Sequence, residues 1–288
     1  MFPLIPLVVA FIGSIYAAIW DLRTTEIPDE IPHAMIVFAL IFYAIQSVIE
    51  SNYWIFLNSV IAGTAIFVLG FIMYYAGQWG GGDAKILAAI IFLLPVGFVQ
   101  SSLPFPLIYL LNVFIVGAGY MIFYSVVLSL MNRRILAAFL LDVRKGQAFR
   151  VLLPSIVVAC IAVFSIINFL VIKFSPINQP ITLDLLKWPV IATLMPVGLF
   201  IVWRFAKAVE DVGFKRKIPL SKLKIGDVLI ESKIWEGITE KQLKKIKTSG
   251  KRFVWVKEGV RFAPTFPLAL AFTLVYGDFL LMILKITV

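Results

Sequence analysis

The stretch WGGGDAKIL (Trp79–Leu87) places three glycines, an aspartate and a lysine between two long apolar runs. An earlier stretch, IWDLRTTEIPDEIPH (Ile19–His33), also ends an apolar run with an aspartate, Asp21. Consecutive glycines cost backbone entropy and add no apolar surface, and a carboxylate beside lipid is energetically expensive. The two stretches therefore need a common explanation, which depends on the apolar segments around them.

The apolar segments identify the class of protein. The chain has 288 residues, of which 61% are hydrophobic and only 15% are charged, and a soluble domain cannot cover so much apolar surface with so few charges. A membrane span needs about 20 predominantly apolar residues. Such segments occur at residues 2–20, 33–49, 54–79, 84–100, 105–131, 151–173, 188–208 and 264–286. The sequence predicts an all-α polytopic membrane helix bundle of six to eight transmembrane helices.

The positions of Lys and Arg predict the orientation of this bundle. With the amino terminus outside the cell, all but three of the 26 Lys and Arg residues fall on the cytoplasmic side, and cytoplasmic loops of membrane proteins are enriched in these residues. The exceptions are Lys173, Lys187 and Lys285. We expect a multi-pass protein of the plasma membrane. The same bias accounts for the net charge of +10, so nucleic acid is not an expected partner.

Residues 209–263 form the one sizeable polar segment. Short strands are predicted at 227–232 and 252–262, with a helix between them that starts after Thr239 and ends before Gly250. We therefore expect three parts, namely a transmembrane bundle (1–208) that carries both aspartates, a small cytoplasmic α+β insert (209–263) and a last transmembrane helix (264–288).

The predicted topology brings Asp21 and Asp83 to the cytoplasmic ends of their helices, at similar depth. Each could simply cap or flank a helix. The glycine run before Asp83 favours a functional role, because such a run lets the backbone bend or another chain approach closely. Two adjacent carboxyl groups can share a proton, so that one activates water while the other polarises a carbonyl. This is the chemistry of aspartic peptide hydrolysis, and it requires no metal or cofactor.

These motifs resemble a known family. GGGD (Gly80–Asp83) fits the G-x-G-D signature of membrane aspartic proteases, and DLRTTEIPDEIP (Asp21–Pro32) resembles the first catalytic motif of type IV prepilin peptidases. LSKLKIGDVL, GITEKQLKKIK and VKEGVRFAPTFPLALAFTLVYGD, within residues 220–278, resemble the insert and last helix of archaeal prepilin and preflagellin peptidases. The chain lacks the paired C-x-x-C motifs of many bacterial members, which points to the archaeal branch.

The resemblance implies an endopeptidase that removes the short basic leader from prepilin- or preflagellin-like precursors at the cytoplasmic membrane face. Asp21 and Asp83 match the two catalytic positions. Gly80, Gly81 and Gly82 are candidates for contact with the substrate strand, although a plain interhelical loop is the alternative. The acidic residues that could attract a basic leader, or simply form a solvated loop, are Glu26, Asp29 and Glu30.

Three alternatives remain open. A proton- or ion-coupled transporter or channel could use two carboxylates at the membrane edge. A presenilin-type intramembrane protease shares G-x-G-D, but its first aspartate is expected inside a span. An inactive scaffold for pilus assembly would tolerate the loss of both aspartates.

Overall fold

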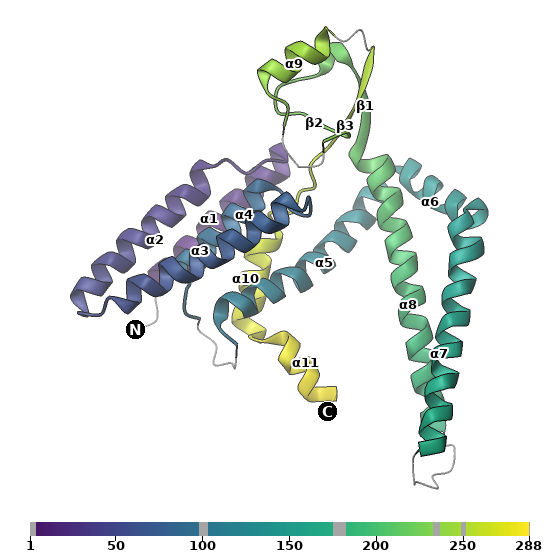
Figure 1. Ribbon diagram of the computed structural model, residues 1–288. Coiled ribbons are helices and arrows are strands. Elements are labelled where there is room, and N and C mark those ends of the chain that lie inside the picture. The colour runs from purple at the N-terminus through teal and green to yellow at the C-terminus, as the bar shows by residue number, and fades with distance from the viewer. Residues whose placement is uncertain (1–3, 98–102, 175–182, 233–236, 249–251, 288) are drawn as a thin grey trace. The chain divides into compact units, whose positions relative to one another are not determined.

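The computed structural model describes residues 4–97, 103–174, 183–232, 237–248 and 252–287 (Figure 1). The chain divides into two compact units, one formed by Met1–Phe123 with Lys215–Val288 and the other by Tyr124–Phe214. Within the described residues, five helices are long and apolar enough to cross a membrane. They are Leu4–Thr24, Glu30–Ile49, Trp54–Tyr75, Phe105–Met131 and Ala148–Ile167. The prediction of a helical multi-pass membrane protein with a small insert is confirmed.

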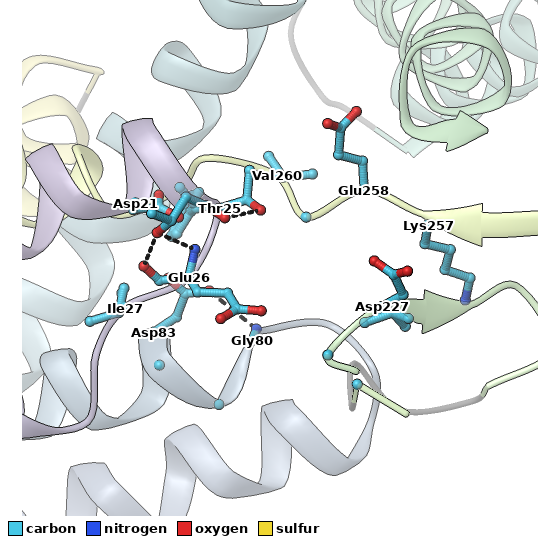
Figure 2. Close-up of a pocket in the computed structure, with 18 of the residues that line it drawn as sticks. Asp21, Thr25, Glu26, Ile27, Gly80, Asp83, Asp227, Lys257, Glu258 and Val260 are labelled. Carbon is cyan, nitrogen blue, oxygen red and sulfur yellow. Dashed lines mark hydrogen bonds between the residues drawn. The ribbon is translucent and has the colours of Figure 1, made fainter. Parts of the chain in front are cut away.

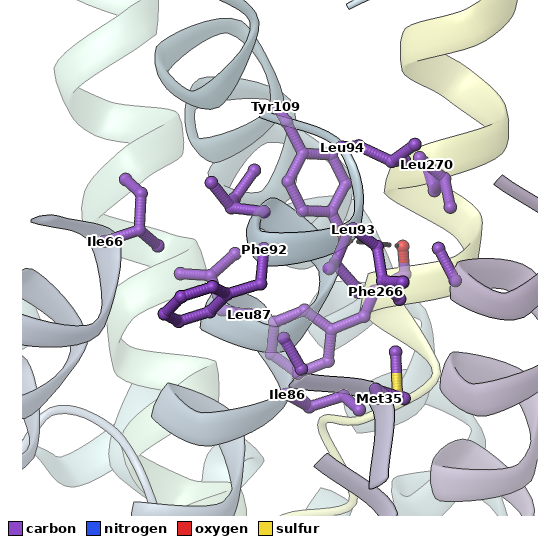
Figure 3. Packing of buried hydrophobic residues seen from close by; sticks show 14 of the residues in the cluster. Met35, Ile66, Ile86, Leu87, Phe92, Leu93, Leu94, Tyr109, Phe266 and Leu270 are labelled. Atoms are coloured by element: carbon purple, nitrogen blue, oxygen red, sulfur yellow. Dashed lines mark hydrogen bonds between the residues drawn. The ribbon is translucent and has the colours of Figure 1, made fainter. Parts of the chain in front are cut away.

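The first unit is built around helix α4 (Gly81–Leu93). Every residue of α4 from Ile86 to Leu93 is buried, and the helix packs against α1 (Leu4–Thr24), α2 (Glu30–Ile49) and α3 (Trp54–Tyr75). Figure 3 shows its apolar side chains beside those of Tyr109 and Phe266. At 13 residues the helix is about 20 Å long, against a hydrocarbon core of about 30 Å. The expected span over 84–100 is therefore wrong in length, and α4 is a short core helix.

The early end of α4 depends on side chains from its neighbours. The last carbonyls of a helix have no partner within it and need one when they are buried away from water. Tyr43 of α2 donates its hydroxyl to the carbonyl of Leu93 at 2.7 Å, and Ser59 of α3 donates to that of Phe92 at 2.6 Å. The chain can therefore leave the helix at Leu94 inside the bundle.

The predicted last helix is divided in two. Helix α10 (Thr265–Tyr276) ends at Gly277, which has a φ of 61°, and α11 (Phe279–Thr287) follows. The side chain of Asn112, on α5 (Phe105–Met131), donates to the Gly277 carbonyl at 2.8 Å. Asp278 accepts a hydrogen bond from the Leu281 backbone N–H at 3.1 Å, so it caps the start of α11.

The insert is a three-stranded antiparallel sheet with one helix. The strands are β1 (Lys215–Pro219), β2 (Val228–Leu229) and β3 (Phe253–Lys257), in the order β1-β3-β2. Helix α9 (Glu240–Lys247) begins after Thr239 as predicted, with a capping box between Thr239 and Gln242; Gly250 lies outside the described residues. Strand β1 was not expected, because its sequence KRKIP is basic and ends in proline, which is unusual except in an edge strand.

The second unit contains helices beyond the aspartate-bearing segments. The carboxy-terminal end of α5 leads into α6 (Arg133–Lys145), α7 (Leu153–Phe174) and α8 (Leu183–Val209). Arg204 of α8 forms an ion pair with Asp142 of α6 at 2.7 Å. Both side chains are largely shielded from solvent, so the pair fixes the two helices more firmly than an exposed pair would.

Candidate active site

A pocket of about 930 Å³ lies in the first unit, where helix ends meet the insert. One wall comes from the end of α1 and the residues that follow it, and another from the glycine run and the first turn of α4. The insert supplies a third wall, from Arg216 of β1 through Gly226 and Val228 to the segment after β3. Figure 2 shows Asp21, Asp83 and Glu26 together with Asp227 and Glu258 around this pocket.

Asp21 lies in the last turn of α1, and only 4% of its surface is exposed. Its Oδ2 accepts a hydrogen bond from the backbone N–H of Ala263 at 2.9 Å. The chain turns immediately after α1, at Thr25, whose φ of 62° is unusual for a β-branched residue. The Thr25 N–H bonds to the Asp21 carbonyl at 2.8 Å, so this turn closes the helix directly behind the carboxylate.

Asp83 lies in the first turn of α4, outside the five candidate spans. Its Oδ2 accepts a hydrogen bond from the Gly80 N–H at 3.1 Å, so the capping role that the sequence suggested is present. Burial raises the pKa of Asp83 from 3.8 to about 7; the negative charge of Asp21 adds to this effect and the Gly80 hydrogen bond opposes it. A carboxyl group with such a pKa is largely protonated just below neutral pH.

The structure thus brings the two predicted aspartates to one pocket. They come from opposite kinds of helix end, one from the last turn of α1 and one from the first turn of α4. Their side chains interact electrostatically, and Figure 2 shows both reaching toward the same part of the pocket. Acid–base chemistry by two neighbouring carboxyl groups requires that their proton affinities differ.

The three glycines before Asp83 all line the pocket but differ in their surroundings. A Cβ added to Gly82 would lie 3.0 Å from Cβ of Ile27, whereas at Gly81 the nearest atom would be 3.7 Å away, on Tyr74. Gly82 is therefore needed for close packing with the segment after α1. Gly226, Gly237 and Gly259 line the pocket from the insert, so backbone is exposed on opposing walls.

The three predicted acidic residues have different positions. Glu26 lines the pocket. Asp29 precedes α2, but its side chain makes no cap and instead pairs with Lys85 at 2.7 Å. Glu30 is the exposed first residue of α2 and is not among the residues that line the pocket. Of the three, only Glu26 lines the pocket.

Sequence reasoning missed the contribution of the insert. A small cytoplasmic insert was expected, but none of its residues was assigned to the site, whereas several of them form a wall of the pocket. Asp227 and Glu258 both reach this wall; Glu258 pairs with Arg216 at 3.0 Å, and Asp227 accepts a hydrogen bond from the Lys224 N–H at 2.7 Å. The available signal was the glycine beside each acidic residue, in GD (226–227) and EG (258–259).

The chain is similar to three archaeal proteins. It is 28% identical over 267 residues to the prepilin peptidase EppA of Methanothermobacter thermautotrophicus, which covers 85% of this chain and 65% of that protein. It is 34% identical over 92 residues to the preflagellin peptidases of Methanocaldococcus jannaschii and Methanococcus maripaludis. Those matches cover 32% of this chain and 39% and 40% of the two proteins.

The match to a family lies in the part of the chain that holds both aspartates. The model of the type IV leader peptidase family matches residues 8–122. This range contains the end of α1, the glycine run and all of α4. The resemblance expected from the sequence is therefore confirmed, since residues 8–122 match the type IV leader peptidase family and the chain is similar to a prepilin peptidase over most of its length.

Proposed function

We propose that this protein is a membrane aspartic endopeptidase that removes leader peptides from prepilin- or preflagellin-like precursors, with Asp21 and Asp83 as its catalytic pair. The observation that carries the proposal is the meeting of these two carboxyl groups in one pocket, where they interact electrostatically. The similarity to prepilin and preflagellin peptidases supports the choice of substrate.

The proposed reaction assigns a different role to each aspartate. Asp83, with a pKa of about 7, carries the proton, and Asp21 is ionised. Asp21 takes a proton from water as the water oxygen bonds to the peptide carbonyl carbon, while Asp83 gives its proton to the carbonyl oxygen. The tetrahedral intermediate then collapses: one hydroxyl returns its proton to Asp83 as the C=O bond reforms, the C–N bond breaks, and the amine nitrogen leaves with the proton held by Asp21. Both steps use only the two carboxyl groups and water.

The walls of the pocket suit an extended peptide. Glycines on opposing walls let a substrate backbone approach closely. We propose that Gly80, Gly81 and Gly82 contact the substrate strand, and that Glu26 attracts a basic leader. Asp29 and Glu30 are weaker candidates, since Asp29 is paired with Lys85 and neither lines the pocket.

We also propose that the pocket faces the cytoplasm. The insert that forms one of its walls carries many of the Lys and Arg residues of the chain, and such residues concentrate on the cytoplasmic side of membranes. With this orientation the amino terminus lies outside, and a precursor could reach the site before it is exported. Cysteine accessibility in intact and opened cells, with single cysteines at Lys241 and Glu50, tests the orientation; we expect only Glu50→Cys to react from outside.

The decisive experiment is leader cleavage by purified protein in liposomes. Wild type is compared with Asp21→Asn and Asp83→Asn, because Asn keeps the volume but cannot ionise. Asp278→Asn is the matched control, since Asp278 caps α11 and is not among the residues lining the pocket. We expect both active-site variants to lose cleavage while the control retains it. Cleavage that persists in either would overturn the proposal, and ion flux that depends on both aspartates would favour a transporter.

A further inference from the structure

The segment between β3 and α10, residues 258–263, lies against the end of α1. Arg261 Nε donates a hydrogen bond to the carbonyl of Leu22 at 2.9 Å, and the Ala263 N–H donates to the Asp21 carboxylate at 2.9 Å. Gly259 allows this approach, because a Cβ there would lie 3.1 Å from the Thr25 carbonyl oxygen. The insert is thus connected directly to the helix end that carries Asp21.

Asp21 occupies a position that is unfavourable for a carboxylate. The carboxy-terminal end of a helix carries partial negative charge on its free carbonyls, so an anion in the last turn is destabilised. Asp83, from α4, adds a second acidic group. On α2, the titratable residues nearest in sequence, Glu30 and His33, are exposed, and α10 carries no charged residue. Lys85 of α4 pairs with Asp29, whereas Arg261 bonds directly to this helix end through the Leu22 carbonyl.

Arg261 counteracts the negative charge at this helix end. Its hydrogen bond to Leu22 satisfies one of the carbonyls left open at the end of α1, and its positive charge offsets the partial negative charge of this helix end. The Ala263 hydrogen bond, which follows two residues later, then fixes the direction of Asp21 Oδ2.

We propose that Arg261 is a positioning residue of this site, which holds the Asp21 carboxylate ionised and oriented and thereby makes the insert necessary for the chemical step. This inference rests on the proposed peptidase function. Arg261 acts through Asp21 and the end of α1 rather than on the substrate, so its loss should lower kcat more than it raises KM.

Cleavage kinetics test the inference with three variants. Arg261→Gln removes the charge, and we expect kcat to fall roughly ten- to hundredfold, with the acidic limb of the pH profile shifted upward by about one pH unit. Arg261→Lys keeps the charge and should restore the limb to its wild-type position. Arg252→Gln, an exposed arginine of the insert outside the pocket lining, removes equal charge and should match wild type. An unchanged limb in Arg261→Gln would overturn the proposal, because a merely structural role does not move it.

A second measurement separates this inference from the proposed function. In an Asp83→Asn background, the carbonyl infrared band of the protonated Asp21 can be followed through a pH titration, with Asp21→Asn/Asp83→Asn as the blank. We expect Arg261→Gln to raise the midpoint by about one pH unit and Arg261→Lys to leave it in place. This result would support the role of Arg261 even if wild type cut no precursor, whereas identical midpoints would refute it.

Discussion

Lys85 and Asp29 form an ion pair, with 2.7 Å between Lys85 Nζ and Asp29 Oδ1. Lys85 is in the first turn of α4, two residues after Asp83, and Asp29 ends the segment that leads from Asp21 to α2. The pair therefore joins the two segments that carry the candidate catalytic aspartates. Its side chains are 24% and 57% exposed, so solvent screens much of the attraction.

Breaking this pair should have a small effect. We expect Lys85→Gln and Asp29→Asn each to lower the unfolding free energy by no more than about 1 kcal/mol. The interaction energy between the two side chains should also be no more than about 1 kcal/mol. Cleavage should remain within about fivefold of wild type. A double-mutant cycle on thermal unfolding and on cleavage rate measures both. If Lys85→Gln abolished cleavage as completely as the aspartate changes, Lys85 would have to take part in the chemistry.

Gly82→Ala tests the close packing behind the dyad. The added methyl would lie 3.0 Å from Ile27 Cβ, so we expect the segment after α1 to shift and cleavage to fall about tenfold. Thermal stability should change little, because replacing glycine by alanine stabilises a helix by about 0.5–1 kcal/mol and offsets the crowding. Gly119→Ala, on α5 with open space around it, is the control.

A second substitution at the contact makes this test sharper. Ile27→Ala in the Gly82→Ala background removes most of the crowding side chain, so part of the lost activity should return. If Gly82→Ala were fully active alone, the glycine would not be needed for packing against Ile27.

The sequence predicts which helices exist much better than it predicts where they end. The residues of α4 are apolar on every side, and such a pattern is equally compatible with a membrane span and a buried helix. The difference is made by Tyr43 and Ser59, whose hydroxyls bond to the carbonyls at its end. These contacts join residues that are 50 and 33 positions apart, and no local pattern indicates them.

At the candidate site, too, local patterns could be read from the sequence but contacts between distant residues could not. Asp21 and Asp83 could be found because each is a rare carboxylate at the edge of an apolar run. The hydrogen-bond donor to Asp21 could not be found in the same way. It is the backbone N–H of Ala263, 242 residues away, and every residue except proline has such a group. The predicted topology placed the insert on the same side as Asp21, but gave no reason to choose Arg261 among 26 basic residues.

Tyr43→Phe should show how much the capping of α4 contributes to stability. The change leaves the Leu93 carbonyl buried without its 2.7 Å partner, and we expect a loss of about 1–3 kcal/mol. Thermal unfolding in detergent measures this, with Tyr75→Phe as the control, because Tyr75 is 66% exposed. Equal melting temperatures for the two variants would mean that another donor forms a hydrogen bond to the Leu93 carbonyl.

The pKa of Asp83 predicts how stability depends on pH. Its value is about 7 in the folded chain, against 3.8 for an unperturbed aspartate. Between these pH values the folded chain binds a proton that the unfolded chain has released, so this residue makes stability fall as pH rises from about 4 to about 7. Over these three pH units the unfolding free energy should fall by at most about 4 kcal/mol.

Asp83→Asn should remove this dependence, because the amide does not ionise. The unfolding free energy of the variant should exceed that of wild type only slightly at pH 4. The excess should grow up to pH 7 and stay constant at higher pH. Asp278→Asn should show no such trend. Thermal unfolding at a series of pH values measures the difference, and a constant offset between pH 4 and pH 8 would mean that Asp83 titrates normally. In that case Asp83 could not serve as the proton donor at neutral pH, and the roles proposed for the two aspartates would have to be exchanged.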